Sequence, residues 1–144
     1  MTRDDQLLID VMGWFEADAD VQELLGDDGD VVPAAIAMEV DVNPRLFVGV
    51  SETTSERDNF REDKEFAVRV GVFATTQWVA RGGTVLELTQ LKARAKDVLT
   101  EHRDGWGALG VQADEEIQPT SEPDGYLGVV ETAYERDDPH ATHQ

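Results

Sequence analysis

The chain has 144 residues, no cysteine and a formal net charge of -19 at pH 7, with 31 acidic residues against 12 basic ones. This length fits one domain with a single core, and the lack of cysteine excludes disulfides, thiolate metal sites and a cysteine nucleophile. So large an excess of acid repels nucleic acid, which argues against specific DNA binding.

The acidic residues are spread along the whole chain, and only three of the basic residues are lysines. Two interpretations are open: an acidic protein that binds a basic partner in ordinary cytoplasm, or a protein that works in near-saturating salt, where the screening length falls to about 3 Å or less. A partner-binding patch would concentrate its acids, so the even spread favours salt, and the composition resembles that of proteins from extreme halophiles. No apolar run approaches the length of a membrane span, and the N-terminus lacks an apolar signal core.

The first predicted element is a helix. Apolar residues follow helical spacing from Leu7 to Leu25, with an irregularity at residues 18–20. Gly26 stands where a helix would stop, and an acidic turn follows it. Val31–Val32 before Pro33 predicts extended backbone.

The next predicted elements are strands. Residues 34–42 alternate apolar and other residues as a strand would, although their alanines weaken that interpretation. Residues 45–50 predict a strand that is apolar on both faces and therefore covered on both sides. Residues 51–63 contain a single large apolar residue, Phe60, and join two predicted strands. This stretch is either a solvated loop tip or a long hairpin arm that orders against a neighbour, with Phe60 as its anchor and Arg57 and Arg61 as its charged contacts.

The stretch from Lys64 to Glu101 organises the chain. It begins with a strand whose one face carries apolar residues at every second position: Phe66, Val68, Val70 and Val72. A connector with two glycines leads to Thr84, a predicted N-cap with Glu87 at the spacing of a capping box. The following helix carries an apolar stripe: Leu88, Leu91, Ala95, Val98 and Leu99.

Two further strands are expected near residues 106–113 and 126–134, with a polar turn at residues 119–125 between them. The connections are short, so the sequence predicts an α+β fold in which a mainly antiparallel sheet of four to five strands packs against two helices, with a long hairpin arm. We expect residues 1–136 to form a single domain, with the arm at residues 51–63, and residues 137–144 to form a flexible tail.

Two helices cover only one face of such a sheet. On the predicted second face the strands carry Phe47, Arg69 and Phe73, with glycines at Gly49 and Gly71. An exposed and partly apolar sheet face needs a cover, and we expect this one to contact another subunit.

No motif of catalysis stands out, so we expect no enzymatic activity, no cofactor and no metal. The turn Asp27–Asp30 does not match a calcium-loop pattern, and His140 and His143 lie in the expected tail. Gly82–Gly83 before a helix is a phosphate-binding arrangement in principle, but it lacks a P-loop lysine and is better explained as a connector.

The order of elements is similar to that of the small tail-terminator and neck (head–tail joining) proteins of long-tailed viruses. The features that carry the resemblance are Leu24-Leu25-Gly26 at the end of the first helix, Val48-Gly49-Val50, a long loop, a long strand, a helix, and a last strand with Val129-Val130 and Tyr134. The resemblance covers residues 5–136 and is one of element order and length, without an invariant motif.

This resemblance implies a virion structural protein that forms a homo-hexameric ring. The ring would cap the tail tube, join it to neck and head-completion proteins, and let DNA pass through its lumen without specific binding. With the halophilic composition, the implied setting is a tailed virus of a haloarchaeon, with the protein made in the host cytoplasm and placed in the virion. The alternative is a cytosolic halophilic α+β module that binds a small ligand or acts as a regulatory partner.

Overall fold

A computed structural model describes residues 3–53, 63–102, 108–113, 116–121 and 124–137. They form an α+β fold with helices α1 (Arg3–Ala17), α2 (Ala19–Leu25), α3 (Thr76–Ala80) and α4 (Val85–Glu101), and a 3-10 turn η1 (Ala34–Ile36). The strands are β1 (Asp30–Pro33), β2 (Arg45–Thr53), β3 (Asp63–Thr75), β4 (Ala108–Ala113), β5 (Gln118–Ser121) and β6 (Asp124–Asp137).

These strands form one six-stranded sheet in the order β1-β2-β3-β6-β4, with β5 paired to β6. All the pairs are antiparallel except β1 with β2, which is parallel. The predicted α+β class is therefore confirmed. The sheet differs in detail from the prediction of four to five strands, because β1 joins one edge and β5 forms a short hairpin with β6.

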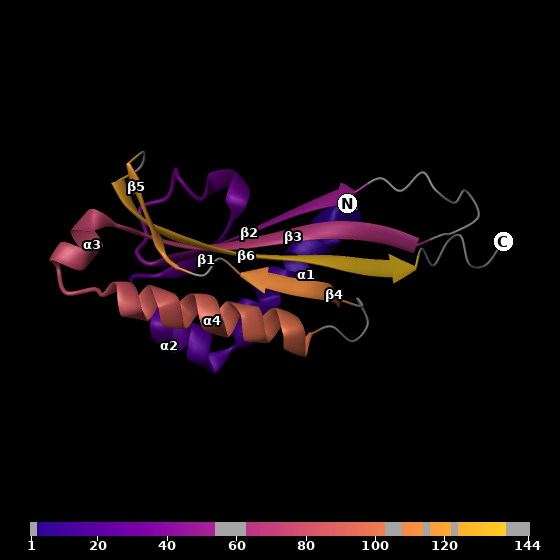
Figure 1. The fold of residues 1–144 in the computed structure, drawn as a ribbon, viewed down its shortest axis with the longest axis horizontal. Coiled ribbons are helices and arrows are strands. Elements are labelled where there is room, and N and C mark those ends of the chain that lie inside the picture. The colour runs from indigo at the N-terminus through magenta and orange to yellow at the C-terminus, as the bar shows by residue number, and fades with distance from the viewer. Residues whose placement is uncertain (1–2, 54–62, 103–107, 114–115, 122–123, 138–144) are drawn as a thin grey trace.

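One face of the sheet carries the core. The predicted apolar residues of β3 are all buried, and Val130 of β6 and Leu46 and Val48 of β2 lie beside them. Helices α1, α2 and α4 bury their apolar stripes in the same cluster. Figure 1 shows α2 and α4 on this side of the sheet, while the chain after β1 rises on the opposite side.

The predicted helix boundaries are confirmed by their caps. Asp18 interrupts the first helical stretch and begins α2, with its carboxylate accepting a hydrogen bond from the Val21 N–H at 3.0 Å. Gly26 ends α2 with a φ of 69°, a value that favours glycine. Thr84 caps α4 by accepting from the Glu87 N–H at 3.1 Å.

Two predicted segments take other forms. Residues 34–42 are a 3-10 turn and further turns, not a strand. The polar stretch predicted as a turn at residues 119–125 contains the end of β5 and the start of β6. Within the described parts of the chain, no helix combines the length and the apolar character needed to cross a membrane.

Candidate functional site

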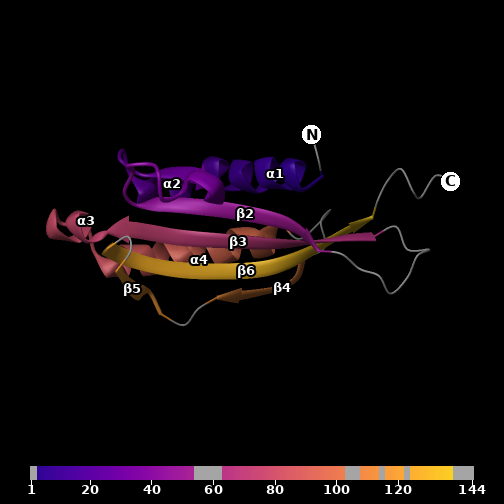
Figure 2. The same ribbon diagram turned by 90° about the horizontal axis from the view of Figure 1, so that it is seen from above.

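The far ends of β3 and β6 project beyond the end of α4 (Figures 1 and 2). β3 and β6 stay paired from Thr75↔Gly125 to Asp63↔Asp137, and β2 pairs with β3 as far as Thr53. Both views show the far ends of β3 and β6 running past the end of α4 (Figures 1 and 2). The predicted contacts Arg57, Phe60 and Arg61 belong to residues 54–62, between β2 and β3 in sequence, and lie outside the described residues.

The face of the sheet away from α1, α2 and α4 is here called the outer face. Phe47 lies on it, and its ring occupies the space beside Gly71 on the neighbouring strand, where an added Cβ would come within 2.0 Å of the ring. Arg69 also lies on it and forms an exposed ion pair with Glu131, with Nε and Oε1 3.2 Å apart. Two of the three predicted outer-face contacts therefore keep accessible surface.

Phe73 keeps almost no accessible surface, which corrects the expectation that its side chain contacts another subunit. It is 1 % exposed. The guanidinium carbon of Arg45 lies 5.0 Å from the centre of its ring, and Gly125 leaves room for the ring edge on the other side. The chain thus covers this part of the outer face by itself.

The cover is made by residues 34–42, here called the anchored segment. Arg45 is 3 % exposed and donates from Nη1 to the Ala37 carbonyl at 2.6 Å and from Nε to the Val42 carbonyl at 2.9 Å. Burial lowers the pKa of Arg45, and the charge of Asp41 opposes that shift. One buried guanidinium therefore fixes an irregular segment against the sheet through two backbone carbonyls and an aromatic face.

The anchored segment turns Ala37 inward and leaves Ile36 and Met38 40 % and 48 % exposed. Sequence reasoning missed this surface because Ile36 and Met38 alternate with small residues as in a half-buried strand. The sequence feature that could have revealed this surface is Arg45, a charged residue at the start of an otherwise apolar strand. A charged side chain at such a position needs acceptors close by, and here they are the carbonyls of the preceding segment.

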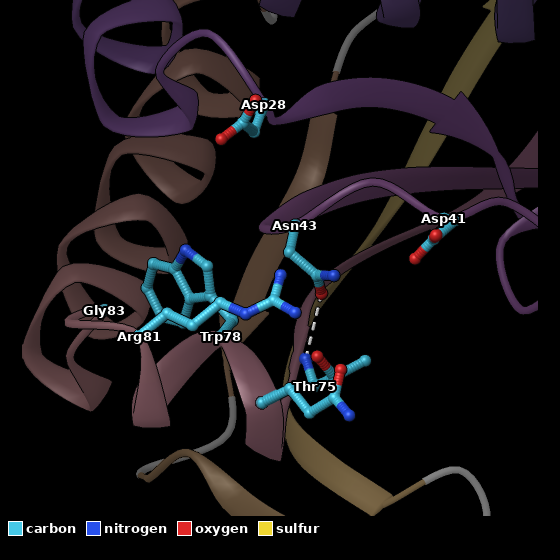
Figure 3. Close-up of a pocket in the computed structure, with 8 residues that line it drawn as sticks. Asp28, Asp41, Asn43, Thr75, Trp78, Arg81 and Gly83 are labelled. Carbon is cyan, nitrogen blue, oxygen red and sulfur yellow. Dashed lines mark hydrogen bonds between the residues drawn. The ribbon is translucent and has the colours of Figure 1, made fainter.

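A polar pocket lies at the opposite end of the sheet from the projecting strands. It has a volume of about 520 Å³ and is lined by Asp28, Asp41, Asn43, Thr75, Gln77, Trp78, Arg81 and Gly83. In Figure 3 the Arg81 guanidinium lies close to Asn43, whose Oδ1 accepts from the Thr75 N–H at 2.9 Å. The Trp78 indole packs on Gly83, so part of the glycine connector shapes the pocket.

The acidic turn at residues 27–30 contributes only Asp28 to this pocket. Among the residues that the structure describes, no three His, Asp or Glu side chains are grouped to hold a metal ion. His140 and His143 lie outside the described residues. The arrangement offers two carboxylates, one guanidinium, amides and an indole face, which suit hydrogen bonding to a small polar molecule.

Comparison with protein-family models and with curated protein sequences finds no match for this chain.

Proposed function

We propose that this protein is a virion structural subunit, a tail terminator that caps a tail tube and joins it to the neck as a ring. The proposal continues the resemblance in element order described above, and the α+β architecture with helices on one face of the sheet is compatible with it. A ring subunit needs surfaces for copies of itself and for its neighbours in the particle, and the strand ends beyond α4 are the candidate for such a surface.

The observation that carries the proposal is the projection of β3 and β6 beyond the end of α4. These two strands stay paired as far as Asp63↔Asp137 and run past the end of α4 (Figures 1 and 2). Strands without a packed face gain little stability in water, because backbone pairing alone barely offsets the entropy of ordering. An extension of this kind is best explained by a partner that packs against it in the assembled state.

The charge of the chain supports the same function. A ring through which DNA slides must not bind the phosphate backbone, and a net charge of -19 disfavours such binding. The same charge makes copies repel one another at low ionic strength. In molar salt the screening length is only about 3 Å, so subunits can approach closely.

The test is sedimentation velocity and native mass measurement in molar KCl. We expect a closed assembly of several copies, visible as rings by electron microscopy, that dissociates as the salt is diluted. A variant in which Asn-Gly replaces residues 54–62, which leaves a four-residue connection between the paired residues Thr53 and Glu65, should remain folded but lose assembly. Leu86→Ser, at a 65 % exposed position on α4, is the matched control and should assemble normally. A monomer at every salt and protein concentration would rule the ring out.

The polar pocket favours a second candidate, a small-ligand-binding module of a halophile. Two carboxylates and a guanidinium line the pocket, with an indole beside them. This candidate predicts a monomer whose melting temperature rises with a small polar ligand, and an Arg81→Ala variant that loses the rise. A ring whose melting temperature does not change with small polar ligands would support the tail terminator over the ligand-binding module.

A further inference from the structure

The polar pocket contains an arginine that the fold does not pair. The other arginines whose side chains the structure describes each bind a carbonyl or carboxylate group of the fold: Arg45, Arg69 and Arg94. The Arg81 guanidinium forms no hydrogen bond or ion pair with any described residue, although Asp28 and Asp41 line the same pocket. In a chain of net charge -19, an arginine that leaves two such carboxylates unpaired is available to a ligand.

The two carboxylates of the pocket come from separate segments. Asp28 lies in the turn after α2 and Asp41 in the anchored segment, and both are exposed. In the view of Figure 3 they lie on either side of Asn43. The pocket therefore presents two negative charges at separate points, together with the single positive charge of Arg81.

The turn that carries Asp28 is fixed against the residue that precedes β2. The Gly29 N–H donates to the Leu25 carbonyl at 3.1 Å, and the Asp30 N–H donates to the Pro44 carbonyl at 3.3 Å. A Cβ added at Gly29 would lie 2.3 Å from the Leu25 carbonyl oxygen and 2.7 Å from that of Pro44, so the turn closes this tightly only with glycine. The Asp28 carboxylate is thus presented by a backbone that is already ordered.

Asn43 and Trp78 are oriented by the fold as well. The Asn43 Oδ1 accepts from the Thr75 N–H at 2.9 Å, so its amide nitrogen remains as a donor for a ligand. The half-buried Trp78 indole packs on Gly83, where an added Cβ would come within 2.3 Å of the ring. A site whose groups are fixed in this way loses little conformational entropy on binding.

The ligand that complements these groups carries two positive charges and one negative charge. A basic amino acid has this composition, and its flexible stem lets the two cationic groups reach two separate carboxylates. Its own carboxylate suits the Arg81 guanidinium, which can bind it through two parallel hydrogen bonds, and the Asn43 amide nitrogen. A guanidinium group also stacks on an indole face, which favours arginine over lysine beside Trp78. The pocket volume of about 520 Å³ lies within the usual range for small-ligand sites.

We propose that the polar pocket binds a free basic amino acid, with L-arginine as the best fit. Asp28 and Asp41 hold its two cationic groups, and Arg81 holds its carboxylate. The inference rests on the ligand-binding module, the second candidate function, and names the ligand class of its pocket. It does not depend on the ring, because every copy of the chain carries the pocket.

An NMR titration in molar KCl tests the proposal through the indole N–H signal of Trp78, which a Trp78→Phe variant identifies. The probes are L-arginine and three analogues that each lack one charge. Agmatine lacks the carboxylate, L-citrulline lacks the side-chain charge, and Nα-acetyl-L-arginine lacks the charge of the α-amino group. We expect a saturable shift with L-arginine, and an affinity at least roughly tenfold higher than that of each analogue.

Two pairs of variants assign the contacts, and all four side chains are exposed, so the variants should fold. Arg81→Gln should bind L-arginine and agmatine equally well, because the partner of the carboxylate is gone. Lys96→Gln removes the same charge from α4 and should keep the preference for L-arginine. Asp28→Asn should lose the preference over either L-citrulline or Nα-acetyl-L-arginine, whereas Asp97→Asn, also on α4, should keep both preferences.

The outcomes separate this inference from the candidate function on which it rests. Equal affinity for L-arginine and its three analogues would overturn the inference and leave the pocket as a site for another ligand. Equal affinity for L-arginine and Nα-acetyl-L-arginine alone would also overturn it, because the ligand would then be the last residue of a peptide. A Trp78 signal that shifts with none of the probes would overturn the inference and the ligand-binding module together.

Discussion

The ring of Phe47 fills the place that a side chain at position 71 would take. An added Cβ on Gly71 would lie 2.0 Å from the Phe47 Cζ, and the two residues are paired across β2 and β3. Aromatic rings over cross-strand glycines are a recognised way to fill a sheet face. The glycine is thus required by packing, not by backbone conformation.

We therefore expect Gly71→Ala to lower the free energy of unfolding by about 1–3 kcal/mol, because the ring must leave its position. Gly13 gives the matched control, since it lies inside α1 with nothing within 4 Å of an added Cβ. Gly13→Ala should stabilise the protein by about 0.5–1 kcal/mol. Urea unfolding at constant salt measures both, and an equal response at the two sites would contradict the packing explanation.

At the scale of elements, α2 and α4 are joined by an arginine between carboxylates. Arg94 donates from Nη2 to Asp18 Oδ1 at 2.6 Å and from Nε to Oδ2 at 3.0 Å, and it also binds Glu101. The hydrogen bonds from Arg94 lower the pKa of Asp18 below its ordinary value of 3.8, against the opposing effect of burial. The same carboxylate caps α2, so one side chain fixes the start of one helix and its contact with another.

This linkage predicts a pH dependence. The pKa of Asp18 is depressed in the folded state, so its stabilising contribution is complete above pH 3.8 and is lost as the pH falls through the folded-state pKa. Asp18→Asn keeps a good capping residue but removes the charge, and should cost about 1–2 kcal/mol at neutral pH. Urea unfolding across pH should show the two proteins converging under acid conditions.

Asp20 provides the comparison for that experiment. Its carboxylate lies 3.8 Å from Arg94 and is 71 % exposed. Exposed ion pairs contribute little, so Asp20→Asn should change the free energy of unfolding by no more than about 0.5 kcal/mol. A pH-independent gap between wild type and Asp18→Asn would contradict the assignment.

At the scale of the whole molecule, a net charge of -19 opposes folding through self-repulsion. Raising KCl from about 0.1 M to about 1 M shortens the screening length from about 10 Å to about 3 Å. We expect the melting temperature to rise by several degrees over this range, since each kcal/mol is worth about 3 °C in a chain of this size.

The control for the salt effect is a variant with four exposed carboxylates made neutral: Glu23→Gln, Asp27→Asn, Asp97→Asn and Glu116→Gln. It should melt higher than wild type at low salt and show a weaker salt dependence. A melting temperature that ignores salt in both proteins would exclude self-repulsion as a limit on stability.

Local spacing was sufficient to predict the two faces of β3, the stripe of α4 and the caps at Thr84 and Gly26. Each of these features follows from the periodicity of one element or from a hydrogen bond between residues a few positions apart, so the local sequence is enough to predict it. The α+β class followed because a strand with one apolar face and helices with apolar stripes bury each other.

The tertiary structure alone decided what covers the outer face. The alternation of residues 34–42 is compatible with a strand, and Phe73 is compatible with an exposed contact, until Arg45 reaches back to the Ala37 carbonyl and closes over the ring. That arrangement brings together segments that are distant in sequence, and the spacing of apolar residues within one element carries no information about such contacts. The sequence by itself thus determined which residues are apolar, and the fold decided which of them, Ile36 and Met38 above all, remain exposed.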